Sequence, residues 1–151
     1  MTQRWKNLFN IYVDTNVLIN YCTGQEDEVR ALNYLFSIRT KERLFTSSLA
    51  IVQTITNLQT KKSHRSAFSR QQTIEILNKI LPKLTVIGLT EKDLDKGFSH
   101  DNEDIEDNIH YVLSQKTKCD AILTNNIKDF RYFQNITLLI PLVSYINKRV
   151  Y

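Results

Sequence analysis

Acidic and amide side chains follow directly after two short apolar runs of this chain. The first run ends at Asp14 and Asn16. The second ends at Thr124 and Asn126, and five carboxylates in residues 101–107 precede it. In an open α/β sheet, ligands bind in the crevice beyond the carboxyl ends of the strands, so these side chains are expected to share one pocket.

The chemistry expected of such a pocket is that of a metal ion. Carboxylates crowded into one crevice repel one another unless a divalent cation compensates them. The candidate acids have no cysteine or histidine partners at zinc spacing, which favours Mg²⁺ or Mn²⁺. An ion of this kind can activate a bound water and clamp a phosphodiester, so the expected reaction is hydrolysis of a nucleic-acid backbone. The candidate acids are Asp14, Asp104, Asp107 and Asp129.

Each acid also has a plain structural interpretation. Asp14 could cap the helix that follows it. Acids such as Asp104 and Asp107 are favourable in the first turn of a helix and could simply be solvated there. Asp129 lies in what could be an ordinary turn. The sequence alone leaves both interpretations open, and the metal hypothesis depends on the conjunction of all of them.

The three histidines are weaker candidates for catalysis. His64 lies in a basic stretch, His100 lies beside the acidic cluster, and His110 is expected on the flank of a helix. Each is predicted to be a surface residue rather than a general base.

Short apolar runs alternate with segments of helical periodicity, which predicts a parallel α/β sheet. The first helix should begin near Thr15 or Asn16, and Ser47 or Ser48 should cap another. The expected fold is a three-layer α/β/α sandwich around a central, mainly parallel sheet of about five strands. The expected strands are residues 12–13, 44–45, 84–87, 121–123 and 136–140.

Two of the expected helices are amphipathic. The helix after Ser47 carries a predicted buried stripe made of Leu49, Val52, Ile55 and Leu58. The helix over residues 103–116 carries a stripe made of Ile105, Ile109, Val112 and Leu113. Asp104, Asp107 and Tyr111 are predicted to share its opposite face.

The composition indicates one domain over residues 1–151. No apolar segment approaches the roughly 20 residues that span a bilayer, so the protein is expected in the cytoplasm and not in a membrane. Two distant cysteines predict buried thiols in a reducing compartment. The three glycines form no nucleotide-binding motif. A net charge of +4 gives a weak preference for an anionic partner such as RNA or DNA.

The stretch over residues 60–70 is polar and basic, and we expect it to be a loop. One interpretation is that its cations contact RNA phosphates while Phe68 stacks on an unpaired base. The other is a solvated connection between helices. The candidate RNA-binding residues are Lys61, Lys62, Arg65 and Arg70.

Four segments, taken in order, give the sequence a family resemblance. They are residues 12–19, 45–53, 104–111 and 120–130. Together they resemble the PIN-domain nucleases, in particular the small VapC-type ribonuclease toxins of bacterial toxin/antitoxin pairs. The resemblance covers nearly the whole chain. It implies an acidic pocket that binds Mg²⁺ or Mn²⁺ and cleaves single-stranded RNA, with an antitoxin protein and a second copy of the chain as possible partners.

The resemblance also implies roles for individual residues. Asp14 matches the first acid of the family, Asp107 the acid at a helix start, and Asp104 an accompanying aspartate. The last acidic position falls at Asn126 or Asp129, of which Asp129 is favoured because it is ionised. Asn16 and Thr124 resemble the polar residues that orient the ligands or a metal-bound water.

One position departs from the family pattern. The second acid, normally a glutamate, falls on Gln53, which supplies an oxygen but no charge. We therefore expect weakened metal binding, or a larger share of the work for Asp104. The alternative is a degenerate PIN domain that binds RNA without cutting it.

Overall fold

The computed structural model describes residues 10–130, 133 and 137–139. Its strands are β1 (Ile11–Val13), β2 (Leu44–Ser47), β3 (Thr85–Ile87), β4 (Ala121–Leu123) and β5 (Thr137–Leu139). Its helices are α2 (Thr15–Cys22), α3 (Glu26–Ile38), α4 (Ser48–Gln59), α5 (Arg70–Ile80), α6 (Glu91–Phe98), α7 (Ile105–Lys116) and α8 (Ile127–Phe130). Two short 3₁₀ turns, Lys41–Arg43 and Leu81–Lys83, precede β2 and β3.

The five strands form one parallel sheet in the order β3-β2-β1-β4-β5. β1 is central, and it pairs with β2 through Ile11 and Leu44 and with β4 through Ile11 and Ala121. The predicted α/β fold with a parallel sheet is confirmed. The single domain over residues 1–151 stays a prediction, because both ends of that range lie outside the described residues.

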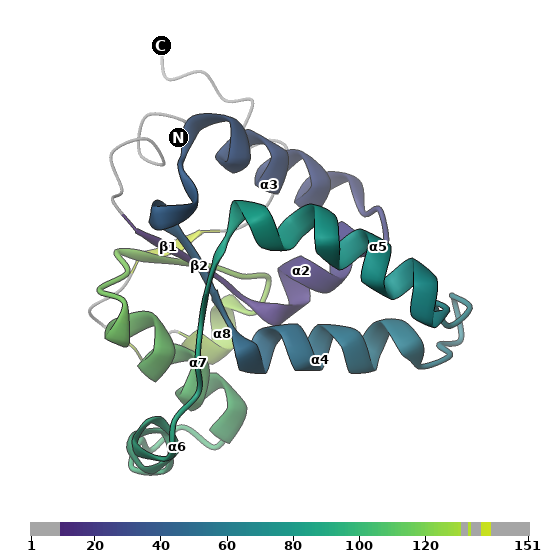
Figure 1. Ribbon diagram of the computed structural model, residues 1–151. Helices are drawn as coiled ribbons and strands as arrows, with labels where there is room; N and C mark the ends of the chain where they lie inside the picture. Colours follow the sequence, from purple (N-terminus) through teal and green to yellow (C-terminus); the bar gives the residue numbers. More distant parts are fainter. Residues whose placement is uncertain (1–9, 131–132, 134–136, 140–151) are drawn as a thin grey trace.

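Alternate residues of the central strands enter two separate cores. Ile11 and Val13 of β1 pack with α2, α3 and α4 in one hydrophobic cluster. Tyr12 of β1 and Ile122 of β4 point to the other face and pack against α7. Figure 1 shows α2 to α5 on one side of the sheet and α6 to α8 on the other. Burial on both faces explains why these strands read as continuous apolar runs.

The helix termini are fixed by polar side chains in the strand-to-helix turns. Ser47 accepts a hydrogen bond from the Ala50 amide and caps α4, as predicted. α2 begins at Thr15, as predicted, and its cap is Asp14, whose carboxylate accepts from the Thr15 amide. None of the helices in the described ranges is long and apolar enough to cross a membrane.

The predicted stripes of α4 and α7 are partly wrong. α4 buries Ala50, Thr54 and Leu58, whereas the Val52 side chain is 60% exposed. The buried face of α4 therefore carries these three residues at four-residue spacing, and α4 packs against α2.

On α7 the error has another cause. Ile105 is 52% exposed and Tyr111 is buried. Every residue from Asp107 to Ser114 is buried, since α7 lies between the sheet and α6. A helix covered on nearly all sides gives no single apolar stripe from which its orientation could be read.

Gly97 allows α6 to pack closely on α7. A Cβ at this position would lie 2.7 Å from Ile109 Cγ1 and 3.4 Å from Ile109 Cα. Overpacking of this kind costs about 1–3 kcal/mol. That exceeds the roughly 0.5–1 kcal/mol that alanine gains over glycine inside a helix. We therefore expect Gly97→Ala to lower the free energy of unfolding, measured by urea denaturation.

The matched control is Gly88→Ala, because a Cβ at Gly88 would meet no atom within 4 Å. Its unfolding free energy should stay within about 0.5 kcal/mol of the wild-type value. Equal effects of the two substitutions would contradict the close packing at Gly97.

Candidate active site

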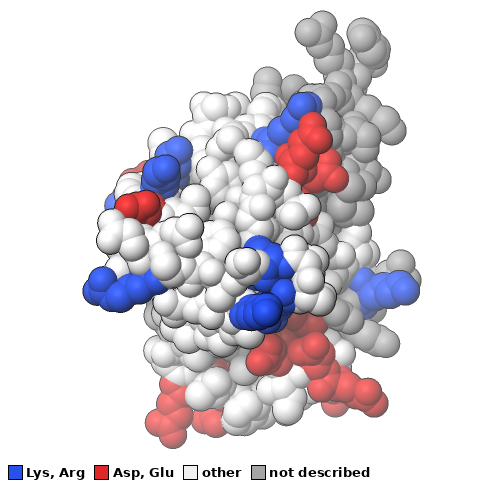
Figure 2. Space-filling view, turned by 90° about the vertical axis from the view of Figure 1, so that its right-hand side faces the viewer, with Lys and Arg blue, Asp and Glu red and all other residues white. Residues whose placement is uncertain are grey.

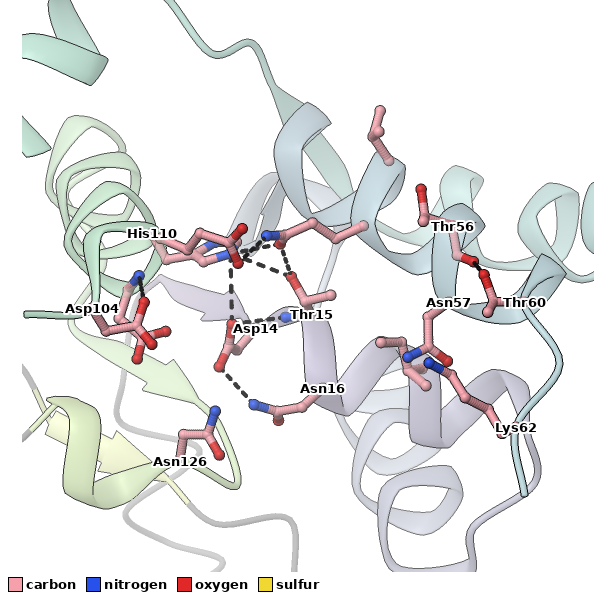
Figure 3. Close-up of a pocket in the computed structure, with 15 residues that line it drawn as sticks. Asp14, Thr15, Asn16, Thr56, Asn57, Thr60, Lys62, Asp104, His110 and Asn126 are labelled. Carbon is pink, nitrogen blue, oxygen red and sulfur yellow. Dashed lines mark hydrogen bonds and ion pairs between the residues drawn. The ribbon is translucent and has the colours of Figure 1, made fainter. Parts of the chain in front are cut away.

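A pocket of about 470 Å³ opens beyond the carboxyl end of β1, between α4 and the first turn of α7. Four acidic residues line it, together with amide and hydroxyl side chains and one lysine. In Figure 3, Asp14, Asp104, His110 and Asn126 lie around one end of the pocket, while Thr56, Thr60 and Lys62 lie at the other end. The acidic lining residues are Asp14, Asp104, Glu106 and Asp107.

Asp14 is the most constrained of these acids. Its side chain is buried, and its Oδ1 accepts a hydrogen bond of 2.8 Å from the Thr15 amide. Its Oδ2 accepts from Asn16 Nδ2 at 2.9 Å and from Thr124 Oγ1 at 2.7 Å. Asp14 is therefore both the helix cap and an oriented member of the pocket, so its two interpretations hold together.

The acidic cluster before α7 divides between two directions. Asp104 is the N-cap of α7, and its Oδ1 accepts from the Asp107 amide at 3.1 Å. Both residues line the pocket, and Asp107 is buried. Asp101 and Glu103 instead line a neighbouring hollow with Lys128. The predicted pair of Asp104 and Asp107 thus shares the pocket with Asp14 and Glu106, while Asp101 and Glu103 face the other hollow.

Gln53 reaches the pocket from α4 and has partners at both ends of its amide. Its Oε1 accepts a hydrogen bond of 2.7 Å from Thr15 Oγ1 and lies 2.9 Å from His110 Nε2. Its Nε2 donates to Glu106 Oε2 at 2.9 Å. Gln53 therefore connects a buried histidine to an acid at the rim of the pocket.

His110 does not lie at the surface, where the sequence predicts it. Its side chain is buried and lines the pocket. Its Nε2 lies 4.0 Å from Asp14 Oδ1, and its Nδ1 lies 2.7 Å from the Tyr12 hydroxyl. Burial lowers the pKa of the imidazole, although the neighbouring carboxylates act against this shift. Its place three residues after Asp107, one helical turn on, was the available signal.

The hydrogen bonds continue from His110 into the sheet. The Tyr12 hydroxyl lies 2.8 Å from Ser47 Oγ, and both side chains are buried. Burial raises the pKa of Tyr12, so its hydroxyl stays protonated and can donate to His110 Nδ1. Ser47, which caps α4, can in turn donate to the Tyr12 oxygen. One chain of hydrogen bonds thus joins β2, β1, α7 and α4.

The loop after β4 is anchored by amide side chains. The backbone N–H of Asn125 donates to Asn16 Oδ1 at 3.1 Å. Asn125 Nδ2 donates to buried Glu28, which also accepts from Asn20. Asn126 lines the pocket. Asp129 belongs to α8, but its side chain lies outside the described residues, so its place in the site stays a prediction.

The basic residues of the loop between α4 and α5 differ in their surroundings. Lys62 lines the pocket, whereas the Arg65 guanidinium donates to Asn57 and to the Leu58 carbonyl oxygen and lies over the Phe68 ring. Lys61 is exposed, as is Arg70 at the first position of α5. Figure 2 shows Lys and Arg side chains on the face of the molecule that lies at the right in Figure 1. Acidic side chains are most numerous at its lower edge.

The donor atoms of the pocket fit a hard divalent cation. Carboxylate and amide oxygens are the ligands that Mg²⁺ and Mn²⁺ prefer. Neither Cys22 nor Cys119 lines the pocket, and burial raises the pKa of both thiols to about 12, which disfavours thiolate ligands. As the side chains stand in the described ranges, no three His, Cys, Asp or Glu residues converge closely enough to hold an ion.

Comparison with known proteins identifies the family. The sequence matches the PIN domain family over residues 10–128, and the chain therefore belongs to that family. No curated protein matches the sequence.

Solved structures share the fold at low sequence identity. One is VapBC2 from Rickettsia felis bound to a promoter DNA fragment, with 17% identity and a TM-score of 0.62 over 86% of this chain and 97% of that one. A toxin–antitoxin complex from Klebsiella pneumoniae has 17% identity and a TM-score of 0.63 over 87% of this chain and 98% of that one. The Mycobacterium tuberculosis toxin VapC20, which cleaves the sarcin–ricin loop, has 12% identity and a TM-score of 0.61 over 82% of this chain and 95% of that one.

Removal of the Tyr12 hydroxyl tests the buried hydrogen-bond chain. Tyr12→Phe leaves His110 Nδ1 and Ser47 Oγ each without one partner inside the protein. An unsatisfied buried polar group costs about 1–3 kcal/mol, so the free energy of unfolding should fall by that order. Chemical denaturation measures the change.

Tyr21→Phe is the control for this substitution. The Tyr21 hydroxyl donates to Asn33 at the exposed surface, so water can replace it as a partner of Asn33. We expect a loss of about 0.5 kcal/mol or less. A Tyr12→Phe protein as stable as Tyr21→Phe would contradict the buried hydrogen-bond chain through Tyr12.

Proposed function

We propose that this protein is a metal-dependent endoribonuclease that cleaves single-stranded RNA. The observation that carries the proposal is the buried Asp14 carboxylate, oriented by Asn16 and Thr124 and facing the acids of α7 across one pocket of a PIN domain. Its catalytic residues would be Asp14, Asp104, Asp107 and Asp129. Of these, Asp14, Asp107 and Asp129 would hold Mg²⁺ or Mn²⁺.

The protein groups have separate tasks in this mechanism. A divalent ion, when bound, supplies charge that activates a water and neutralises the scissile phosphate. Asn16 and Thr124 hold Asp14 in one orientation, so no reorganisation is needed during the reaction. Asp104 and Asp107 add negative charge at the start of α7, where the helix dipole favours it.

The path of the RNA is proposed from the cations beside the pocket. Lys62, Asn57 and Ile19 line both the acidic pocket and an adjoining groove that also contains His64 and Arg65. Lys62 can therefore contact a phosphate next to the scissile one, while Lys61 and Arg70 add positive charge farther out. Arg65 contributes by holding the loop through its bonds to α4.

We further propose that the protein acts in the cytoplasm as the toxin of a toxin/antitoxin pair. The similar structures from Rickettsia felis and Klebsiella pneumoniae are toxin–antitoxin assemblies, which supports an antitoxin protein as a partner. A homodimer is proposed on the family resemblance alone.

Neutralisation of Asp14 tests the enzymatic proposal. Asp14→Asn keeps an oxygen for the Thr15 amide but removes the charge and one acceptor for Asn16 and Thr124. Loss of a supporting residue typically costs a metal site 10- to 100-fold in activity, and we expect loss of this ligand to cost more than roughly 100-fold. The measurement is cleavage of a labelled single-stranded RNA in Mn²⁺.

Asp95→Asn is the control for charge, because Asp95 is exposed on α6 and lies outside the pocket. It should cleave at the wild-type rate. An Asp14→Asn protein that cleaves RNA like Asp95→Asn would exclude the proposed active site.

A second candidate function is RNA binding without cleavage. It is favoured by Gln53, which stands where the family has an acid. The two functions differ in their response to chelation, since contacts between lysines and phosphates need no metal ion. For the enzyme we expect EDTA to stop cleavage and excess Mn²⁺ to restore it. Salt-sensitive binding that persists in EDTA, with no cleavage in Mn²⁺, would instead identify a binding module.

A further inference from the structure

Gln53 supplies no charge at a position where the family pattern has a glutamate. Gln53 lies on α4 at the wall of the pocket, and its amide contacts Glu106, the second residue of α7. Glu106 lies between Asp104 and Asp107 in the sequence and lines the same pocket as both.

The orientation of the Gln53 amide follows from its partners. A carboxylate only accepts hydrogen bonds, so the Gln53 nitrogen must face Glu106 and its oxygen must face Thr15 and His110. This assignment makes His110 Nε2 a donor. The amide is therefore held at one end by a buried histidine and a helix-start hydroxyl, and its other end directs the Glu106 carboxylate to the pocket wall.

We propose that Glu106 supplies the carboxylate that is absent at position 53, so that Gln53 and Glu106 together replace the single glutamate of the family pattern. This rests on the proposed function, because it assigns one more acid to the same metal pocket. Gln53 is then a positioning residue: it contributes an N–H that holds Glu106, and the negative charge comes from α7 instead of α4.

The contact distance explains why position 53 is not acidic in this chain. Gln53 Nε2 and Glu106 Oε2 are 2.9 Å apart. A glutamate at position 53 would place two carboxylates at this distance, where both cannot remain ionised without a compensating cation. Gln53→Glu alone therefore removes the hydrogen bond that holds Glu106 and replaces it with repulsion between two carboxylates.

An exchange of the two side chains gives a direct test. Glu106→Gln keeps an oxygen that can accept from Gln53, so it removes the charge and retains the hydrogen bond. The double substitution Gln53→Glu with Glu106→Gln reverses the direction of that bond and returns the charge to α4. Glu103→Gln is the matched control, since Glu103 belongs to the same cluster but lines a different hollow.

The measurement is Mn²⁺ binding by titration calorimetry, on the full chain and without RNA. We expect Glu106→Gln to weaken Mn²⁺ binding about 10-fold or more, in the range seen when a partner of a metal site is lost. Glu103→Gln should bind like the wild type, and the exchanged double variant should recover to within about 3-fold of it. Thermal unfolding of each variant establishes that it is folded.

The outcomes separate this inference from the proposed function. Equal binding by Glu106→Gln and Glu103→Gln, with binding lost in Asp14→Asn, would overturn the role of Glu106 and leave the nuclease intact. A weakened Glu106→Gln protein that the exchange does not rescue would also overturn it, because the two positions would not be equivalent. Absence of Mn²⁺ binding by the wild type, together with absence of RNA cleavage, would overturn both proposals.

Discussion

The buried carboxylate of Asp14 is the interaction on which the rest of the site depends. It terminates β1, caps α2 through the Thr15 amide and accepts from Thr124 at the end of β4. The backbone amide of Asp14 also donates to the Leu123 carbonyl oxygen, so the two strands end in register. Burial of a polar group is costly unless hydrogen bonds replace its water, and the partners of Asp14 are therefore the residues that shape the pocket.

The same requirement explains the amide side chains around the pocket. Asn16 donates one hydrogen bond to Asp14 and accepts another from the Asn125 backbone, and Asn125 in turn donates to Glu28. Glu28 is buried at the contact of α2 and α3, where its carboxylate accepts hydrogen bonds from two side-chain amides. The loop that carries Asn126 is thereby attached to α2 and α3.

The sequence predicted those features that depend on local pattern. Strands buried on both faces give continuous apolar runs, and the polar residues after β1 and β4 had to meet because parallel neighbours end at the same edge. The position of His110 could not be predicted, since α7 is buried on nearly all sides. The contact between Gln53 and Glu106 joins residues 53 apart on two helices, and no periodicity reports on such a pair. The error at Val52 arose because α4 buries Ala50 and Thr54 beside Leu58, and a stripe of large apolar residues alone does not reveal that face.

The chain from Ser47 through Tyr12, His110 and Gln53 to Glu106 alternates donor and acceptor at every step. Because the last member accepts only, the direction of every bond behind it is set, as far as a hydroxyl buried within the sheet. No single member can reverse its hydrogen bond without leaving two donors or two acceptors face to face. The donor–acceptor direction of these buried hydrogen bonds is thus set by Glu106 at the solvent-exposed rim. All of the bonds must reverse together if one of them does.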